Sequence, residues 1–290
     1  MLSTDVTEEL MAQDAREPGK QELPTEEELT RAGLRLAVEG AVARITISRP
    51  ERRNAMTGRT WTTLAHIGQA LPGDVRIVVI AGEGDIFSAG IDLNMFTPEG
   101  VDGERSIVAG LADGSSDEAD LDAYISELQQ GFLWLRRPDL VTIAAVRGHA
   151  IGAGFQLALA CDLRILADDA KFCMKEPALG LVPDLTGTKP LVDIVGVHRA
   201  TEICLTARKV GAEESRELGL ATLVVGVDEL EGAVDDAVAG LLATNPDAAV
   251  ATKALLQQAA GNTLQEQCAA ERKAQVGRLT ALAKAMAPDA

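Results

Sequence analysis

The chain has 290 residues, 47% of them hydrophobic, which is enough to bury a substantial core in one large domain or two small ones. Its formal net charge of -17 argues against nucleic acid or an anionic membrane surface as a partner, because both need a basic protein surface. No apolar run approaches the ~20 residues that span a bilayer, and the N-terminus has no signal-peptide pattern. The four cysteines are scattered along the chain. We therefore expect a cytoplasmic protein with reduced thiols and no metal site.

The first elements are an acidic arm and a hairpin. Residues 1–30 carry nine acidic residues against Arg16 and Lys20 and have few large apolar side chains, which predicts a mostly disordered tail or a loosely attached arm. Apolar residues then alternate over 34–38 and again over 41–47, with Glu39-Gly40 between the two stretches. This pattern predicts a β-hairpin.

A helix, a buried strand and a long loop follow. Residues 57–71 place their apolar side chains on one helical face, and the apolar run "VRIVVIAG" (75–82) is typical of a strand that is covered on both faces. The polar, acidic segment 94–120 predicts a mobile loop or short helix that closes over a site when a ligand binds.

The second half continues the alternation of strands and helices. A helix is expected around 121–136, a strand over 140–146 and another over 163–167, which together predict an α/β fold of stacked βαβ units. The pattern then becomes almost wholly helical and alanine-rich. We therefore expect a core of residues 31–195 and a helical C-terminal part of residues 196–290.

Two turns built from small residues each follow a predicted strand. One is Gly152-Ala153-Gly154, at the start of the helix in "GHAIGAGFQLALACD", and the other lies in "GDIFSAGIDL" after the strand at 77–80. The first N–H groups of a helix lack internal partners, and small residues let a ligand approach them closely. Two such turns can aim two N–H groups at one oxygen as an oxyanion hole, although each turn alone also suits an ordinary strand-to-helix connection.

The order of the motifs resembles that of the crotonase superfamily, the enoyl-CoA hydratases and isomerases. The matching segments are "ISRPERRNAMT", "IVVIAGEGDIFSAGIDL", "IAAVRGHAIGAGFQLALACDLRILADDAKF", "KEPALGLVPDLTGT" and "NPDAAVATKALL", which leave the acidic arm outside. The resemblance implies a spiral of ββα units with an α-helical C-terminal trimerisation region, assembled as a homotrimer or a dimer of trimers. It also implies an acyl-CoA substrate whose enolate is held by the backbone N–H groups of Ile91 and Ala153.

The resemblance assigns acid/base positions to Gln156, Glu176 and Asp184. Family hydratases have glutamates at the first two, and adding water needs two positioned acid/base groups. An amide does not titrate, so Gln156 is limited to bonding water or substrate, or to a structural role. Family enoyl-CoA isomerases keep only the second glutamate. Dienoyl-CoA isomerases have an aspartate that matches Asp184, and a further one at the position of Gln156 that this chain lacks; Asp184 is otherwise a cap or turn residue after Pro183.

Coenzyme A is part of the expected substrate rather than a separate cofactor, and its phosphates require a local basic patch on an acidic protein. The segment "RPERRNA" matches the family's loop that faces coenzyme A, and its arginines are either phosphate contacts or a solvated charge cluster. Lys253 and Lys273 are candidates to add charge from a neighbouring subunit. The predicted coenzyme A contacts are Arg49, Arg52, Arg53, Ser88, Ala89, Gly90 and Asp92.

The preferred function is an acyl-CoA double-bond isomerase that acts with one main carboxylate base, converting 3-enoyl-CoA to 2-enoyl-CoA or acting on a dienoyl-CoA. Two alternatives stay open. One is an enoyl-CoA hydratase or other lyase in which Asp184, or a water held by Gln156, replaces the missing acid. The other is a non-catalytic acyl-CoA-binding protein that retains the pocket.

Overall fold

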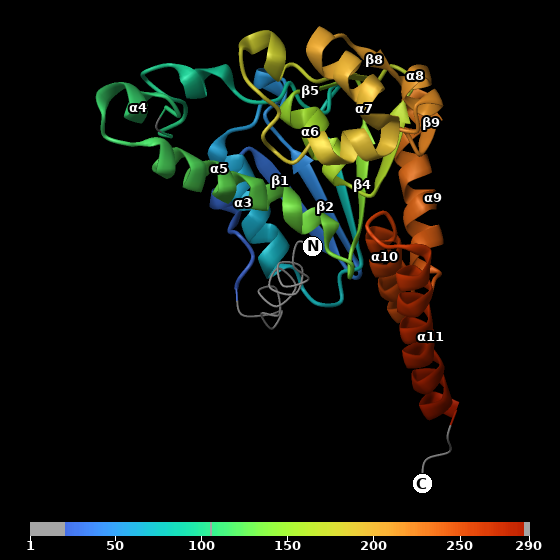
Figure 1. Ribbon diagram of the computed structural model, residues 1–290. Helices are drawn as coiled ribbons and strands as arrows, with labels where there is room; N and C mark the ends of the chain where they lie inside the picture. The colour runs from blue at the N-terminus through green and yellow to red at the C-terminus, as the bar shows by residue number, and fades with distance from the viewer. Residues whose placement is uncertain (1–20, 105, 287–290) are drawn as a thin grey trace.

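The computed structural model of the chain describes residues 21–104 and 106–286. Its framework is one large sheet, with helices on both of its faces (Figure 1). In spatial order its strands are β1 (Leu34–Glu39), β2 (Val42–Ile47), β3 (Ile77–Gly82), β4 (Val141–Val146), β6 (Leu163–Ala167) and β9 (Leu223–Val225). The β1–β2 hairpin is antiparallel as predicted, and every later pair in this sheet is parallel.

A second, small sheet lies beside the first and carries part of the candidate site. Its strands are β5 (His149–Ile151), β7 (Lys171–Cys173) and β8 (Val210–Gly211). β5 runs parallel to β7, and β8 runs antiparallel to it. Strands of two or three residues are too short to show a period of two, and for this reason the sequence pattern did not predict them.

The helices fill the connections and extend the C-terminal part. The longer ones are α2 (Glu26–Arg31), α3 (Gly58–Ala70), α4 (Ala109–Asp113), α5 (Glu118–Leu133), α6 (Ala153–Ala160), α7 (Thr188–Thr206), α8 (Ala212–Glu217), α9 (Leu230–Leu242), α10 (Pro246–Ala259) and α11 (Leu264–Met286). Short 3-10 turns are η1 (Pro50–Arg52), η2 (Leu93–Phe96), η3 (Trp134–Arg136), η4 (Glu176–Leu179) and η5 (Val227–Glu229).

The apolar run of β3 serves two separate cores, one on each face of the large sheet. Val78 and Ile80 lie in the larger core, which α3 and α5 cover, whereas Ile77 and Val79 pack in the smaller core under α9. Figure 1 shows α9 on the side of the sheet opposite α3 and α5. The prediction that this strand is covered on both faces is confirmed, and the burial gives the sheet that positions the site a rigid base.

The two ends of the chain differ from the sequence-based expectation. Of the expected arm, residues 1–20 lie outside the described residues, but α2 follows directly and buries Leu29 in the larger core. Beyond residue 195 we expected an almost wholly helical chain, but the structure also contains the strands β8 and β9. Of these, β9 is the last strand of the large sheet. At the C-terminal end α10 lies beside the sheet and α11 runs away from the body of the molecule (Figure 1).

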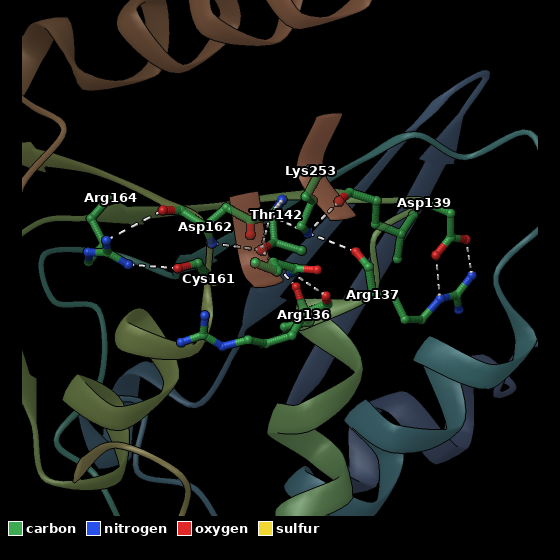
Figure 2. A network of polar contacts seen from close by, with 11 residues as sticks. Arg136, Arg137, Asp139, Thr142, Cys161, Asp162, Arg164 and Lys253 are labelled. Carbon is green, nitrogen blue, oxygen red and sulfur yellow. Dashed lines mark hydrogen bonds and ion pairs between the residues drawn. The ribbon is translucent and has the colours of Figure 1, made fainter. Parts of the chain in front are cut away.

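A partly buried ion pair fixes α10 to the body (Figure 2). The amino group of Lys253 donates to the carbonyl oxygens of Arg137 at 2.8 Å and Leu140 at 2.6 Å, and to Asp162 Oδ2 at 2.7 Å. Thr142 donates to the same carboxylate oxygen through its N–H at 2.8 Å and its hydroxyl at 3.1 Å. Burial lowers the pKa of Lys253, while Asp162 opposes that shift. The amino group of Lys253 is therefore bound within its own chain, contrary to the expectation that it serves a neighbouring subunit.

No helix among residues 21–104 and 106–286 is long and apolar enough to cross a membrane.

Candidate active site

Hydrogen bonds join the two small-residue turns to each other. Ser88 donates its N–H to the carbonyl of His149 at 2.9 Å, and Ile151 donates to the carbonyl of Ser88 at 3.0 Å. Gly90 adopts a φ of 91°, and a Cβ atom there would lie 2.5 Å from the carbonyl oxygen of Ile151 and 3.5 Å from the backbone nitrogen of Ala153. Glycine at this position therefore lets the first turn lie directly against the start of α6.

The N–H of Ile91 is the free donor of the first turn. Met56 donates to the carbonyl of Gly90 at 2.8 Å and accepts from the N–H of Asp92 at 2.8 Å, so the two residues that flank Ile91 are tied to one neighbour. In the segment 88–92, every N–H except that of Ile91 donates to an acceptor within the described residues. The acceptors are the carbonyls of His149, Arg53 and Met56 and the hydroxyl of Ser88.

The second available donor is Ala153, the first residue of α6. The first N–H groups of a helix have no acceptor within the helix, and they lie at its positive end. Among the residues that the structure describes, the N–H of Ala153 makes no hydrogen bond to another group. The two turns thus bring together two free N–H groups, which is the arrangement that an oxyanion hole requires.

Gln156 is a fixed hydrogen-bonding partner of Glu176. Its side chain is completely buried, and its Nε2 donates to Glu176 Oε1 at 2.7 Å. Its Oε1 accepts the N–H groups of Leu185 at 2.9 Å and Gly187 at 3.1 Å. Because two backbone donors face this oxygen, the amide has only one acceptable orientation, with its NH₂ group toward the carboxylate.

Glu176 retains a free oxygen. The residue is 9% exposed, and its Oε2 is buried without a hydrogen-bond partner among the described residues. Burial raises the pKa of Glu176, and the nearby Asp184 carboxylate adds to the increase, whereas the hydrogen bond from Gln156 lowers it. A Cβ atom at Gly152 would lie 3.0 Å from Glu176 Oε1, so this carboxylate lies at the start of α6, next to Ala153. A raised pKa and a free oxygen suit a general base.

Asp184 lies close enough to Glu176 for the two carboxylates to interact. Burial raises the pKa of Asp184, which is partly buried. Its carbonyl accepts a hydrogen bond of 2.6 Å from Gln129 Nε2, which ties the segment after η4 to α5. The structure therefore brings together Gln156, Glu176 and Asp184, the three side chains that the sequence singled out for acid/base chemistry.

Two of the predicted coenzyme A contacts have side chains that bind each other. The Arg49 guanidinium lies 3.2 Å from a carboxylate oxygen of Asp92 and 2.7 Å from one of Asp102, and it donates to the carbonyl of Ala55 at 2.7 Å. The Arg49 side chain is 11% exposed and that of Asp92 is 6% exposed. Internal pairing of this kind argues against a role for either side chain in binding phosphate.

Arg52 and Arg53 are the exposed arginines of this loop. Arg53 has a left-handed φ of 53°, and its carbonyl accepts the N–H of Ala89 at 2.9 Å, so the loop runs alongside the first turn. The N–H groups of Ser88, Ala89, Gly90 and Asp92 are already used, and the carbonyls of Ser88 and Gly90 already accept hydrogen bonds. Of these four residues only Ala89 is partly exposed, so it is the one that a ligand can reach most readily.

Three supporting residues were not singled out by the sequence patterns. Asn54, fully buried, donates to the carbonyls of Glu83 at 2.9 Å and Ile86 at 2.8 Å and so fixes the approach to the first turn. Leu185 and Gly187 hold Gln156, and a Cβ atom at Gly187 would lie 2.6 Å from Gln156 Cγ. The glycine in "DLTGT" is the only sequence signal of this contact.

Known proteins share sequence with most of this chain. The family described as enoyl-CoA hydratase/isomerase matches residues 37–282. The peroxisomal Delta(3,5)-Delta(2,4)-dienoyl-CoA isomerase of Arabidopsis thaliana is 32% identical over 226 residues, which cover 77% of this chain and 80% of the relative. Carnitinyl-CoA dehydratase of Salmonella arizonae is 32% identical over 240 residues, or 80% and 83% of the two chains.

Solved structures are similar over most of the chain. A Thermobifida fusca YX protein described as an enoyl-CoA hydratase, in complex with CoA, is 61% identical, covers 91% of this chain and all of its own, and gives a TM-score of 0.87. Its complex with acetoacetyl-CoA is 62% identical over 89% of this chain and 99% of that one, with a TM-score of 0.86. The predicted crotonase-like fold is confirmed.

Proposed function

Because the chain belongs to the enoyl-CoA hydratase/isomerase family, we propose that it moves a double bond in an acyl-CoA thioester, from the 3-enoyl to the 2-enoyl position or within a dienoyl-CoA. The observation that carries this proposal is the amide of Gln156, whose NH₂ group faces Glu176 at 2.7 Å. A hydratase pattern would place a second titratable group there. With an amide in its place, Glu176 is the main group that exchanges protons at this point of the site.

In the proposed reaction the thioester oxygen accepts hydrogen bonds from the N–H groups of Ile91 and Ala153. Oε2 of Glu176 removes a proton from the carbon next to the thioester carbonyl, and the electron pair of that C–H bond forms a dienolate. The same carboxyl then returns the proton at the far carbon of the former double bond, so no atom is gained or lost. Each oxyanion donor contributes roughly 3–4 kcal/mol, and a positioned base accelerates the step roughly 100- to 10,000-fold.

Asp184 supports the form of the proposed reaction in which the substrate is a dienoyl-CoA. Burial raises the pKa of both Asp184 and Glu176, and the Asp184 carboxylate adds to the increase at Glu176, so one of the two groups can hold a proton while the other is ionised. Such a pair can remove a proton at one position and supply one at a more distant position. The similarity to the Arabidopsis thaliana dienoyl-CoA isomerase supports this form of the reaction.

Acyl-CoA as the substrate class draws support from the Thermobifida fusca YX protein, which has been solved with CoA and with acetoacetyl-CoA. In this chain the exposed Arg52 and Arg53 are the proposed phosphate contacts. Coenzyme A enters and leaves as part of the substrate. The cytoplasm remains the proposed location and rests on the scattered, unpaired thiols.

We also propose a trimer or a dimer of trimers. The helices α10 and α11 have no buried residues in the single chain, although several large apolar side chains lie on them. Light scattering at micromolar concentration should give a multiple of the 30.5 kDa chain mass, and a monomer would contradict the assembly. The exposed apolar side chains are Leu256, Leu264, Val276, Leu279, Leu282 and Met286.

A hydratase is the second candidate function, since the Thermobifida fusca YX protein at 61% identity is described as one. Ultraviolet absorbance distinguishes an isomerase from a hydratase when the protein is incubated separately with a 3-enoyl-CoA and a 2-enoyl-CoA. An isomerase conjugates a 3-enoyl-CoA and so increases the absorbance, whereas a hydratase consumes the conjugated 2-enoyl-CoA and decreases it. A protein that binds acyl-CoA in a calorimeter and changes neither absorbance is the non-catalytic alternative.

A further inference from the structure

We propose that Arg49 is a positioning residue for the Ile91 donor and that it couples this donor to the loop 97–104. The inference rests on the proposed oxyanion hole but not on the choice between isomerase and hydratase. It assigns a role to a side chain that the sequence had suggested for binding phosphate.

The contacts of Arg49 enclose the Ile91 turn from both sides. Its Nη1 donates to the carbonyl of Ala55, the residue before Met56, at 2.7 Å. Its Nη2 lies 3.2 Å from Oδ2 of Asp92, the residue after Ile91. The backbone of Met56 in turn holds both neighbours of Ile91 through two 2.8 Å hydrogen bonds. The Arg49 guanidinium therefore contacts both of the paired segments that orient the Ile91 N–H, one at Ala55 and the other at Asp92.

Asp92 is a buried carboxylate whose free oxygen faces Arg49. Asp92 is 5% exposed, its Oδ1 accepts the N–H of Asn94 at 3.1 Å, and its Oδ2 faces Arg49 and has no hydrogen bond among the described residues. A buried carboxylate that loses its cationic partner must move toward water or take up a proton. Either change would displace the backbone on the carboxyl side of Ile91.

The third partner of Arg49 lies on the loop that follows the turn. Asp102 Oδ2 accepts from Arg49 Nη2 at 2.7 Å, and the Asp102 side chain is 53% exposed. Arg59 holds the same loop to the start of α3, because its Nη1 donates to the carbonyl of Asp102 at 3.2 Å and its N–H donates to Glu104 Oε2 at 2.8 Å. Movement of this loop away from α3 would remove one of the two carboxylates that hold the Arg49 guanidinium.

The test compares Arg49→Met, Arg49→Lys and Asp102→Asn with a matched control, Asp235→Asn. Asp235 also accepts from an arginine, Arg44, at 2.6 Å, but the pair is exposed and lies at α9, away from the site. Three quantities are measured for each variant: kcat for isomerisation, Kd for butyryl-CoA by calorimetry, and the apparent pKa of bound acetoacetyl-CoA from the ultraviolet absorbance of its enolate. The charged enolate depends on the oxyanion donors much more strongly than the neutral thioester does.

A misaligned donor lowers kcat and spares ground-state binding. We expect Arg49→Met to lower kcat by about 10- to 100-fold and to raise the apparent pKa of bound acetoacetyl-CoA by about one unit or more, with the Kd of butyryl-CoA changed less than about threefold. Arg49→Lys, which cannot reach all the acceptors at once, should fall between wild type and Arg49→Met. Asp102→Asn should lower kcat by about three- to tenfold, and Asp235→Asn should match wild type.

The proposal is overturned if folded Arg49→Met retains the wild-type pKa of bound acetoacetyl-CoA, or if its kcat and butyryl-CoA affinity fall together without any change in that pKa. If Arg49→Met does not fold, Asp102→Asn decides, and a kcat and bound-ligand pKa identical to those of Asp235→Asn count against the coupling. Because acetoacetyl-CoA ionises without any movement of a double bond, its pKa tests Arg49 even if the protein proves to be a hydratase.

Discussion

Replacing Gln156 with glutamate exchanges the NH₂ group of its side chain for an oxygen and leaves the shape of the side chain nearly unchanged. One oxygen of the new carboxyl still accepts the N–H groups of Leu185 and Gly187. The other takes the place of Nε2, 2.7 Å from Glu176 Oε1. Two full charges at that separation repel by about 6 kcal/mol at an effective dielectric constant of 20, an upper figure because each charge is shared by two oxygens. The pair therefore retains one proton at neutral pH.

The protonated pair supplies the acid and the base that addition of water needs. We expect Gln156→Glu to gain measurable hydration of 2-enoyl-CoA and to show no increase in isomerase kcat, since the shared proton makes Glu176 a weaker base. The raised pKa of the pair adds a second readout. Stability that depends on its proton is present at low pH and is lost as pH rises through the raised pKa, so the Tm deficit of the variant relative to wild type should grow from acidic to alkaline pH.

The assay follows the absorbance of crotonyl-CoA and of a 3-enoyl-CoA with both proteins, together with thermal melts across that pH range. Wild-type protein that hydrates crotonyl-CoA as fast as the variant would show that Gln156 does not limit the chemistry. A Tm difference that is independent of pH would show that the two carboxyl groups do not share a proton, which refutes the geometric argument.

Two further predictions concern charges that are buried or partly buried. Glu176→Gln should lower isomerase kcat by roughly 100- to 10,000-fold. Because burial raises the pKa of Glu176, its ionised form costs stability at pH 7, so the variant should have an equal or higher Tm there and lose that advantage at acidic pH; a lower Tm at pH 7 would contradict this. Lys253→Met leaves Asp162 without its cation and should lower the free energy of unfolding by roughly 3–5 kcal/mol in denaturant titrations, whereas a change below about 1 kcal/mol would show that the pair does not anchor α10.

The sequence predicted the site in its parts because the relevant signals are local. A strand that ends in small residues, followed by a helix, identified both turns, whereas Gln156, Glu176 and Asp184 were assigned through the resemblance to the crotonase superfamily. The strands β5, β7 and β8 were missed because they are stabilised by pairing with each other rather than by any pattern within two or three residues.

Side-chain partners far apart in the chain were also beyond sequence reasoning. The sequence does not distinguish an arginine that binds phosphate from one that binds a carboxylate of its own chain. Arg49 binds Asp92 and Asp102, which lie 43 and 53 positions later. Similarly, the amide of Gln156 was left open between a ligand contact and a structural role. Its orientation is set by the N–H groups of Leu185 and Gly187, about 30 positions further along the chain, which only the folded backbone brings to it.

The central claim, that Glu176 moves a proton without adding water, is tested most directly by the mass of the product formed from a 3-enoyl-CoA in deuterated water. We expect a 2-enoyl-CoA that carries no added water. It should contain deuterium from the solvent to the extent that the carboxyl exchanges its proton between the two steps, and Glu176→Gln should form almost none of it. A main product heavier by one molecule of water, or an undiminished rate in Glu176→Gln, would contradict it.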